Sequence, residues 1–418
     1  MNTQLPDRHL PAIVIGGGQA GLSASYLLKS RGIEHLVFER HRIAHAWRTQ
    51  RWDSFCLVTP NWQCQLPGFG YAGPEPFGFM PCADIVGYIE RYAKTFDPPL
   101  REGVAVQRVY RHGGVFAVQT NEGNYTTDNV IVAIGGYHIP RKPALAAQLP
   151  HTLIQLHSSQ YKNPGQLPQG AVLVVGTGQS GCQIAEDLHL AGRRVHLCTG
   201  SAPRVARRYR GRDVVEWLND MGHYDIPVEN HPQGAQVRAK SNHYVTGRDG
   251  GRDIDLRRFA LEGMRLHGRL RAVSDGTLLL GDDLEKNLDR ADASAEAIKD
   301  QIDGWIIAQN LAVPTEPRYV PVWRPENPAA EIAIAGEGIA AIIWATGFHS
   351  DFTWIDIDIF ETSGYPRHVR GITPQPGLYF LGLPWLHSWG SGRFSGVARD
   401  ADYIVADITR NRALVSAA

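Results

Sequence analysis

The sequence is short of the residues that thiol chemistry requires. Its five cysteines, none in CxxC spacing, are Cys56, Cys64, Cys82, Cys182 and Cys198. Close cysteine pairs are what redox-active disulfides need. The pattern therefore predicts reduced, buried thiols in a cytoplasmic protein and argues against disulfide exchange.

Net charge, long apolar runs and metal-ligand patterns are also missing. Basic and acidic residues both number 42, so we expect neither a nucleic-acid partner nor an anionic membrane. No apolar run approaches the roughly 18 residues that cross a bilayer, and residues 1–11 show no signal-peptide pattern. The 17 histidines have no ligand spacing such as HExxH, so no metal is expected.

What the sequence does contain is an internal repeat. Residues 12–39 and 172–199 align without a gap. Each copy has an apolar β-branched run, a glycine-rich turn, a helical stretch that stops at a glycine, and a second short strand. This order predicts the opening βαβ unit of a doubly wound fold, present twice.

The glycines of each turn suit a bound pyrophosphate. The first allows a tight turn, the second lets a pyrophosphate approach, and the third lets the helix pack on the strand. The helix N-terminus then offers free N–H groups to phosphates. Two copies in this context predict two dinucleotide sites; two glycine turns without a ligand are the alternative. The matching glycines are Gly16, Gly18 and Gly21, and Gly176, Gly178 and Gly181.

The residue that ends the second strand of each copy distinguishes the nucleotides. Glu39 ends the first, where a carboxylate binds ribose hydroxyls and repels a 2′-phosphate; this suits FAD or NAD, and we predict FAD. Thr199 ends the second, with Arg204 as the first choice for a 2′-phosphate, which predicts NADPH. Some of the other nearby arginines are expected to be solvated surface only; they are Arg193, Arg194, Arg207 and Arg208.

The remaining chain shows further strands, hairpins and helices. We predict hairpins within 104–118 and 270–280, strands at 129–136, 338–347 and 378–382, and helices at 254–267, 282–311 (one or two) and 397–409. The predicted fold class is α/β, with two Rossmann-like dinucleotide-binding domains, for FAD and NADPH, and a helical and hairpin insertion. The FAD-binding domain is predicted at 1–165 and 314–418, the NADPH-binding domain at 166–205 with part of 314–350, and the insertion or cap at 206–313. The glycine-rich stretch 241–252 is either an active-site loop or a surface loop.

These residues resemble the class B flavoprotein monooxygenases, which include flavin-containing monooxygenases, YUCCA-type enzymes and Baeyer–Villiger monooxygenases. The resemblance covers 10–205 and 335–410. The whole chain is also similar to bacterial flavin oxidoreductases associated with nitrilase-type gene clusters. The motifs that carry the resemblance are GGGQAG at 16–21, Glu39, Trp47, a fingerprint ending at His157 and Tyr161, GTGQSG at 176–181 and ATGF at 345–348.

The resemblance implies a function and a set of site residues. NADPH would reduce FAD, a C4a-(hydro)peroxyflavin would form with dioxygen, and a small organic substrate such as an amine would be oxygenated. Asn61 stands where the family has an asparagine beside the flavin; a turn asparagine is the alternative. The residues expected to bind the cofactors are Gly16, Gly18, Gln19, Ala20, Gly21, Glu39, Arg40, Trp47, Val106, Gly135, Gly176, Gly178, Gln179, Ser180, Gly181, Thr199, Arg204, Thr346, Gly347, Phe394 and Ser395.

Two other classes stay open at this point. An NADPH-dependent flavin reductase or dehydrogenase would pass electrons to another acceptor, and a non-catalytic FAD-binding protein would have no use for the second turn. The fingerprint segment favours oxygenation over both. A homodimer is left open by the sequence.

Overall fold

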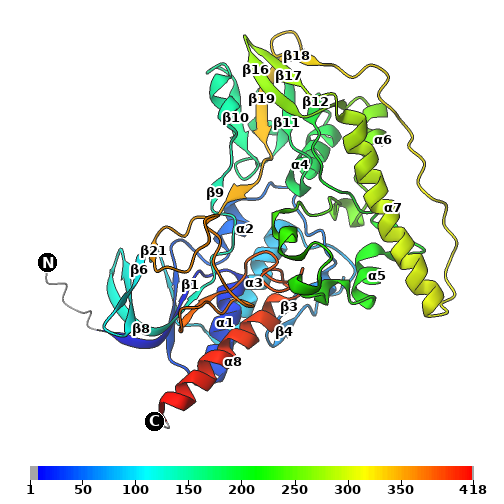
Figure 1. The fold of residues 1–418 in the computed structure, drawn as a ribbon. Helices are drawn as coiled ribbons and strands as arrows, with labels where there is room; N and C mark the ends of the chain where they lie inside the picture. Colours follow the sequence, from blue (N-terminus) through cyan, green and yellow to red (C-terminus); the bar gives the residue numbers. More distant parts are fainter. Residues whose placement is uncertain (1–7, 417–418) are drawn as a thin grey trace.

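The structure, a computed structural model, describes residues 8–416 as two units, each built around its own sheet (Figure 1). This confirms the mixed α/β class. Apolar clusters lie on both faces of each sheet, and the β-branched runs of the repeat form the buried central strands. None of the described helices is both long and apolar enough to span a membrane.

The first sheet has a parallel part and an antiparallel part. Its order is β21-β6-β7-β8-β1-β2-β5, with β22 also paired to β8. β1 lies parallel to β2 and β8, whereas β6 and β7 form the hairpin predicted at 104–118. The strands are β1 (His9–Ile15), β2 (His35–Glu39), β5 (Leu100–Glu102), β6 (Val106–His112), β7 (Val115–Thr120), β8 (Gly123–Val132), β21 (Ile355–Asp356) and β22 (Leu378–Phe380).

Three helices pack on this first sheet unit. α1 (Gln19–Ser30) follows β1 through the first glycine turn, and the C-terminal helix α8 (Val397–Ser416) packs against it. α3 (Cys82–Phe96) contributes Ile85, Tyr88 and Ile89 to the same apolar cluster. Helix α8 thus lies beside α1, which is near the start of the chain, as Figure 1 shows.

The second sheet is entirely parallel, in the order β10-β19-β11-β12-β15. α4 (Gln179–Leu190) connects β11 to β12 through the second glycine turn. An antiparallel ladder of β16, β17 and β18 contains the hairpin predicted at 270–280. The strands are β10 (Ile154–His157), β11 (Ala171–Val175), β12 (Val195–Cys198), β15 (Arg265–His267), β16 (Leu270–Ser274), β17 (Thr277–Leu280), β18 (Glu331–Ala333) and β19 (Ile339–Trp344).

The second sheet takes strands from outside the range 166–205. β10 precedes that range, and β15 lies within the block 206–313 that we predicted as an insertion. The strands β16 and β17 of the separate ladder lie in the same block. The helix predicted at 254–267 is wrong in its second half: α6 spans Leu256–Leu261, and Gly263, at φ +105°, ends it. Because Leu266 and His267 are buried beside β12, sheet pairing overrides the helical spacing there.

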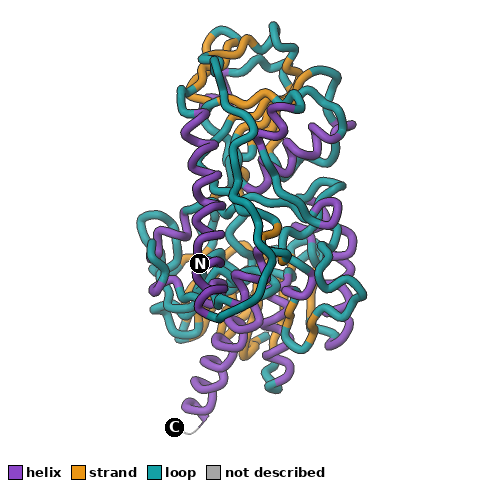
Figure 2. Tube along the Cα trace, turned by 90° about the vertical axis from the view of Figure 1, so that its right-hand side faces the viewer, coloured by secondary structure: helices purple, strands orange, loops and turns teal. Residues whose placement is uncertain are grey.

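A single long helix ties the second unit to the rest. The stretch predicted as one helix or two is a single helix, α7 (Leu284–Ala308). It runs from the second sheet towards α5 (Val214–Asp220) in Figure 1, and Figure 2 shows its length from the side. Residues 309–330 return beside it, where Arg318 pairs with Asp300 at 2.7 Å and with Asp303 at 2.8 Å.

Two chain crossings join the units. β9 (Ile139–Pro140) and β20 (Phe348–His349) pair in antiparallel fashion between the sheets. The remaining elements are α2 (His45–Thr49), β3 (Gln65–Leu66), β4 (Phe69–Gly70), β13 (Arg208–Tyr209), β14 (Arg212–Asp213) and short 3-10 turns, including η1 (Asn61–Gln63).

Candidate active site

The two glycine turns have the same backbone geometry. Gly16 and Gly176 have φ of +114° and +106°, and a methyl group on either would lie 2.7 Å from the carbonyl oxygen of Ala133 or Ala345. A methyl group on Gly21 or Gly181 would lie 1.8 or 1.9 Å from the carbonyl oxygen of the first glycine. Sterics therefore require glycine at these four positions.

The second glycine of each turn differs, because nothing lies within 4 Å of a methyl group added at Gly18 or Gly178. Each is the residue before a helix, α1 or α4, whose first N–H groups have no acceptor within the helix. The fold does not need glycine at these two positions, and the open space at a helix N-terminus suits an approaching phosphate.

The strand ends beside the turns carry the residues that distinguish the nucleotides. The Glu39 carboxylate accepts hydrogen bonds from the N–H of Gly17 at 2.8 Å and of His41 at 2.9 Å. Arg40 beside it is exposed. Thr199 is buried and donates both its N–H and its hydroxyl to the His267 carbonyl, each at 2.8 Å.

Arg204 is ion-paired with Asp292, although its Nη2 atom is buried without a hydrogen-bond partner. It is 4% exposed, donates from Nε to Asp292 at 2.6 Å and lies 4.3 Å from the ring centre of Tyr319. Arg207 is likewise buried and paired with Asp213 at 2.6 Å. Arg193 binds carbonyl groups of the 164–170 segment, at the opposite end of β12.

Two other cations, missed by the sequence analysis, stand on segments that contact Thr199. Asn287 of α7 donates to the Thr199 hydroxyl at 3.2 Å, and Arg290, one turn further on, is exposed and makes no hydrogen bond or ion pair among the described residues. Arg269 follows the end of β15, beside Thr199, and shares Asp283 with Arg271 at 3.5 and 3.6 Å. No local signal marked either arginine, because β15 and α7 meet β12 only through the tertiary fold.

Two equivalent glutamines connect the turns to segments distant in sequence. Gln19 donates to the Gly392 carbonyl at 3.1 Å and accepts from Trp47 Nε1 at 3.2 Å. Gln179 donates to the Val245 carbonyl at 2.5 Å. Arg393 Nη2 in turn donates to Asn242 Oδ1 at 2.9 Å. Residues 392–393 and 242–245 therefore form a bridge between the two glycine turns.

Three of the buried polar atoms that lack a hydrogen-bond partner lie beside this bridge. They are Trp62 Nε1 and Gln63 Oε1 in η1, and Ser395 Oγ in the C-terminal segment. The two segments meet where Gln65 N donates to the Phe394 carbonyl at 3.3 Å, and Phe394 stacks on Trp47 at 5.7 Å between ring centres. Buried polar groups without partners are unusual in folded proteins, so this region has the donors and acceptors of a ligand site.

Asn61 holds a loop in place. Its Nδ2 donates to the Glu75 carbonyl at 2.9 Å, and its Oδ1 accepts from Met80 N at 2.7 Å. Because Asn61 is only 3% exposed, these contacts favour the alternative of a turn asparagine.

The other predicted residues lie at the ends of the strands. Val106 begins β6, and Ala20 and Ser180 lie in the first turns of α1 and α4. Gly135 and Gly347 follow β8 and β19 at equivalent places, with φ of +74° and +82°. Thr346 donates its hydroxyl to the Arg141 carbonyl at the crossing between the units.

The fingerprint residues make buried contacts at the ends of β10 and at α4. His157 lies against the Gly347 carbonyl, 2.9 Å from Nε2. The Tyr161 hydroxyl donates to Asp187 of α4 at 2.6 Å. Asp187 also accepts from Ser54 at 2.5 Å and Arg248 at 2.7 Å. Arg248 belongs to the stretch 241–252, which is thus packed between the two units.

The cysteines are unsuited to disulfide exchange. All five are free thiols, and four of them are buried. Burial raises the pKa of the Cys56 thiol to about 11 and that of Cys64 to about 12. Both are therefore protonated at neutral pH, whereas the thiolate is the reactive form.

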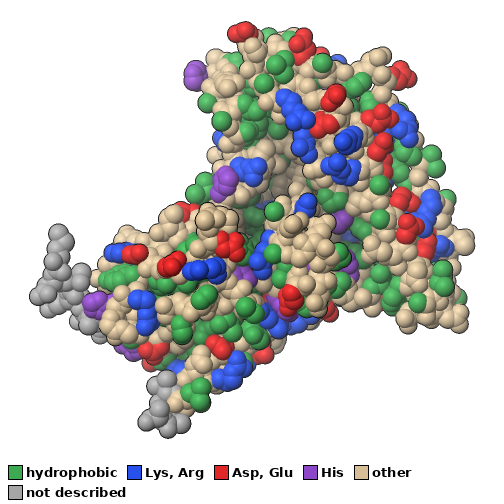
Figure 3. Space-filling model, in the orientation of Figure 1, with side chains coloured by type: hydrophobic (Ala, Val, Ile, Leu, Met, Phe, Trp, Pro, Cys, Tyr) green, Lys and Arg blue, Asp and Glu red, His purple; other side chains and the backbone are tan. Residues whose placement is uncertain are grey.

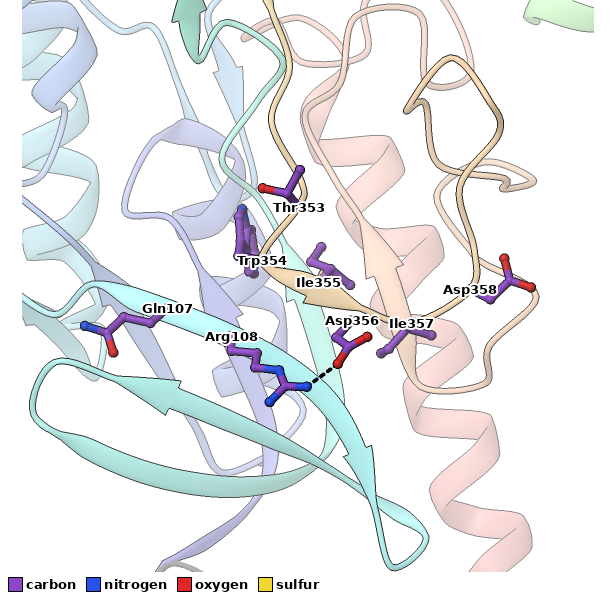
Figure 4. Close-up of a pocket in the computed structure, with 8 residues that line it drawn as sticks. All are labelled: Gln107, Arg108, Thr353, Trp354, Ile355, Asp356, Ile357 and Asp358. Carbon is purple, nitrogen blue, oxygen red and sulfur yellow. Dashed lines mark hydrogen bonds and ion pairs between the residues drawn. The ribbon is translucent and has the colours of Figure 1, made fainter. Parts of the chain in front are cut away.

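Other candidate features lie elsewhere or are missing. The described residues include no group of three or more His, Cys, Asp or Glu that could hold a metal ion. An open hollow of about 570 Å³ lies at the far edge of the first sheet, where Arg108 of β6 pairs with Asp356 of β21 (Figure 4). This edge is separated from β1 by β7 and β8, so the hollow is not part of the site between the glycine turns.

Comparison with known proteins agrees with this arrangement. Residues 13–258 match the family model described as pyridine nucleotide-disulphide oxidoreductase. An uncharacterized CzcO-like oxidoreductase from Geobacillus kaustophilus is 32% identical over 399 residues, covering 95% of this chain and 97% of that protein. The chain therefore belongs to the pyridine nucleotide-disulphide oxidoreductase family, and it is an oxidoreductase.

Two further likenesses point to the monooxygenase branch. The probable indole-3-pyruvate monooxygenase YUCCA4 of Arabidopsis thaliana is 28% identical over 200 residues, which cover 47% of this chain and 48% of that protein. The fold is shared with a flavin-containing monooxygenase from Stenotrophomonas maltophilia at a TM-score of 0.67 and 19% identity, covering 97% of this chain and 99% of that one. The resemblance to class B flavin monooxygenases predicted from the motifs is confirmed.

Proposed function

We propose that this protein is an FAD- and NADPH-dependent monooxygenase that oxygenates a small organic substrate, with amines as the first class to test. The observation that carries the proposal is the pair of glycine turns with one backbone geometry, joined by the bridge of residues 392–393 and 242–245. Two nucleotide sites facing one bridge suit electron transfer between two bound cofactors. The predicted division into FAD-binding and NADPH-binding Rossmann-like domains is part of this proposal.

The residues at the first turn fit FAD. The open space at Gly18 would admit the pyrophosphate, and Glu39 would bind the ribose. Trp62, Gln63 and Ser395 provide unpartnered polar atoms beside the aromatic surface of Trp47 and Phe394, as a flat heterocycle with donors and acceptors requires. When bound, FAD supplies the hydride acceptor and, once reduced, the site of oxygen activation.

The second turn fits the pyrophosphate of NADPH, but we reassign the contact to its 2′-phosphate. Arg204 is neutralised by Asp292, and Arg208 adjoins Tyr209, which binds Asp303 about 24 Å along α7 from Asn287. Arg290 stands one turn beyond Asn287, which contacts Thr199, and it is unpaired among the described residues. Arg269 follows His267, whose carbonyl binds Thr199. We propose that Arg290 and Arg269 bind the 2′-phosphate.

The protein's own part in the reaction is to hold the two glycine turns and the bridge in place and to shield the reacting groups from water. Gln19 and Gln179 fix the bridge segments against the two turns. The cluster of Tyr224, Trp62 and Trp389, formed by the cap, η1 and the C-terminal segment, would exclude water from the reacting groups. No acid–base pair is assigned, since the cofactors perform the difficult chemistry.

A labelled-oxygen experiment distinguishes this proposal from the alternative of an NADPH-dependent reductase. The purified yellow holoenzyme is given NADPH, ¹⁸O₂ and a panel of amines, sulfides and ketones, and products are analysed by mass spectrometry. A monooxygenase transfers one labelled oxygen atom to a panel member for each NADPH consumed. Release of all the oxygen as hydrogen peroxide, with fast reduction of an added quinone, would contradict the proposal and favour the reductase.

A further inference from the structure

Arg393 occupies the middle of the bridge between the two glycine turns. Its neighbour Gly392 accepts a hydrogen bond from Gln19, and its own Nη2 binds Asn242, three residues before the Val245 carbonyl that Gln179 contacts. A substrate of the proposed reaction has to meet the cofactors between these turns. The face shown in Figure 3 is hollowed between the two halves of the molecule, and basic side chains lie along that hollow.

The charge of Arg393 has no carboxylate partner among residues 8–416. The fully buried arginines are paired with carboxylates: Arg204 and Arg257 with Asp292, and Arg207 with Asp213. Arg393 is partly buried, and the partial loss of water lowers the pKa of its guanidinium. A partly desolvated cation with no carboxylate beside it suits an anion that residues 8–416 do not supply.

The surroundings of Arg393 hold it in place and offer flat apolar surfaces. The guanidinium stacks on Trp389, 3.9 Å from the ring centre, and binds only neutral acceptors, the Trp389 carbonyl and Asn242. Trp389 packs on Tyr224 at 4.2 Å between ring centres, and Trp62 joins the same cluster. The two hydrogen bonds leave part of the five-donor fork free, a geometry suited to a carboxylate.

The anion that best fits is on the substrate side. The cofactor phosphates are assigned to the helix N-termini at Gly18 and Gly178. A second arginine without a carboxylate partner, Arg51, stacks on Trp47, 4.9 Å from the ring centre. Because Trp47 donates a hydrogen bond to Gln19 at the first glycine turn, Arg51 lies on the FAD side. Arg393 instead contacts Asn242 of the cap.

We propose that Arg393 binds the carboxylate of a small aromatic acid, which makes aromatic acids the substrate class of this site. The aromatic ring lies against Trp389 and Tyr224, and the group to be oxygenated points away from the carboxylate. This inference rests on the proposed function insofar as it calls the bound acid a substrate. Binding of the acid to Arg393 requires no turnover.

Titration of the oxidised holoenzyme with NADP⁺ present tests the inference by the change in flavin absorbance. The probes are phenylacetate and its uncharged analogue phenylacetamide. We expect saturable binding of phenylacetate, at least tenfold weaker binding of phenylacetamide, and loss of this difference in Arg393→Gln, because hydrogen bonds between charged groups are worth about that factor or more. The matched control is Arg399→Gln, six residues after Arg393. It removes an exposed charge that is paired with Asp225, and this variant should bind phenylacetate like the wild type.

Three outcomes overturn the inference: no saturable binding of phenylacetate, equal binding of the two probes, or a weakened affinity for NADPH in Arg393→Gln with phenylacetate unaffected. Flavin content is measured for each variant, and Arg393→Lys, which keeps the charge, should bind phenylacetate with intermediate affinity. Because the titration measures binding and not oxygenation, it gives a clear result for Arg393 even if the protein proves to be a reductase. The failure of the proposed function and the failure of this inference are therefore distinguishable.

Discussion

At the scale of single residues, the three glycines of each turn have different roles, and substitution separates them. Gly181→Ala would place a methyl group 1.9 Å from the Gly176 carbonyl, whereas Gly178→Ala meets open space. We expect Gly181→Ala to destabilise the second unit by about 1–3 kcal/mol or more, as overpacking does, and Gly178→Ala to leave stability unchanged. Thermal unfolding of both variants measures this; equal melting temperatures would contradict the packing role of Gly181.

The preference for NADPH over NADH tests the reassigned phosphate contact. Arg290→Gln should reduce the preference in kcat/KM by about tenfold or more, the worth of a charged hydrogen bond. Arg208→Gln, which removes an equal charge far from Thr199, should change nothing. If Arg290→Gln keeps the full preference and Arg204→Gln loses it at unchanged melting temperature, the original assignment to Arg204 is the correct one.

The cysteines give a third prediction at this scale. Because burial raises the pKa of Cys56 to about 11 and of Cys64 to about 12, alkylation by iodoacetamide should be slow at pH 7 and accelerate as the pH rises towards those values. Flavin reduction by NADPH should survive in Cys56→Ser. A loss of reduction in Cys56→Ser with FAD retained would mean that a thiol takes part after all.

Residue roles set by local sterics could be predicted from sequence, and roles set by distant partners could not. The spacing of Gly16, Gly18 and Gly21 predicts a turn whose backbone the structure reproduces twice. The partner of Arg204 is Asp292, which lies 88 positions away on α7, so no pattern around Arg204 indicates that its charge is neutralised. The same holds for Arg290, because α7 comes to the end of β12 only through the tertiary contact of Asn287 with Thr199.

At the scale of elements, helix α4 is held against the first unit by one carboxylate. Asp187 accepts hydrogen bonds from Ser54 of the first unit, Tyr161 of the connection between the units and Arg248 of the cap. Because α4 begins at the second glycine turn, Asp187 fixes the position of that turn relative to the first.

Asp187→Asn should therefore act on electron transfer. We expect the anaerobic rate of flavin reduction at saturating NADPH to fall about tenfold, since losing a hydrogen bond to a charged group costs roughly 1.5–3 kcal/mol, while the affinity for NADPH stays within about twofold. Asp402→Asn removes an exposed carboxylate paired with Arg31 and is the control. An unchanged reduction rate in Asp187→Asn would show that the contact is structural only.

Elements were predicted well where pattern and environment agree. The hairpins at 104–118 and 270–280 and the strand within 338–347 are present because their turn residues and apolar runs are local signals. The stretch 254–267 fails in its second half, since Leu266 and His267 pair with β12, a contact that helical periodicity does not include. β15 in turn places His267 against Thr199, two residues before Arg269.

At the scale of the whole molecule, the proposed function depends on the two sheets and on the bridge between them. The duplication predicts two nucleotide-binding units, but the sequence does not indicate that 392–393 and 242–245 meet between them. That contact depends on α8 returning to α1. The position of the active site is thus a property of the assembled chain.

The most direct test of this account is anaerobic reduction of the flavin by NADPH in Gly178→Glu. Nothing lies within 4 Å of a methyl group at Gly178, so the fold tolerates a side chain there while an acidic group repels a pyrophosphate. The account predicts a stable yellow protein with full FAD content whose flavin dithionite reduces and NADPH does not. Normal reduction by NADPH in this variant would contradict the assignment of the second glycine turn as the site of the electron donor.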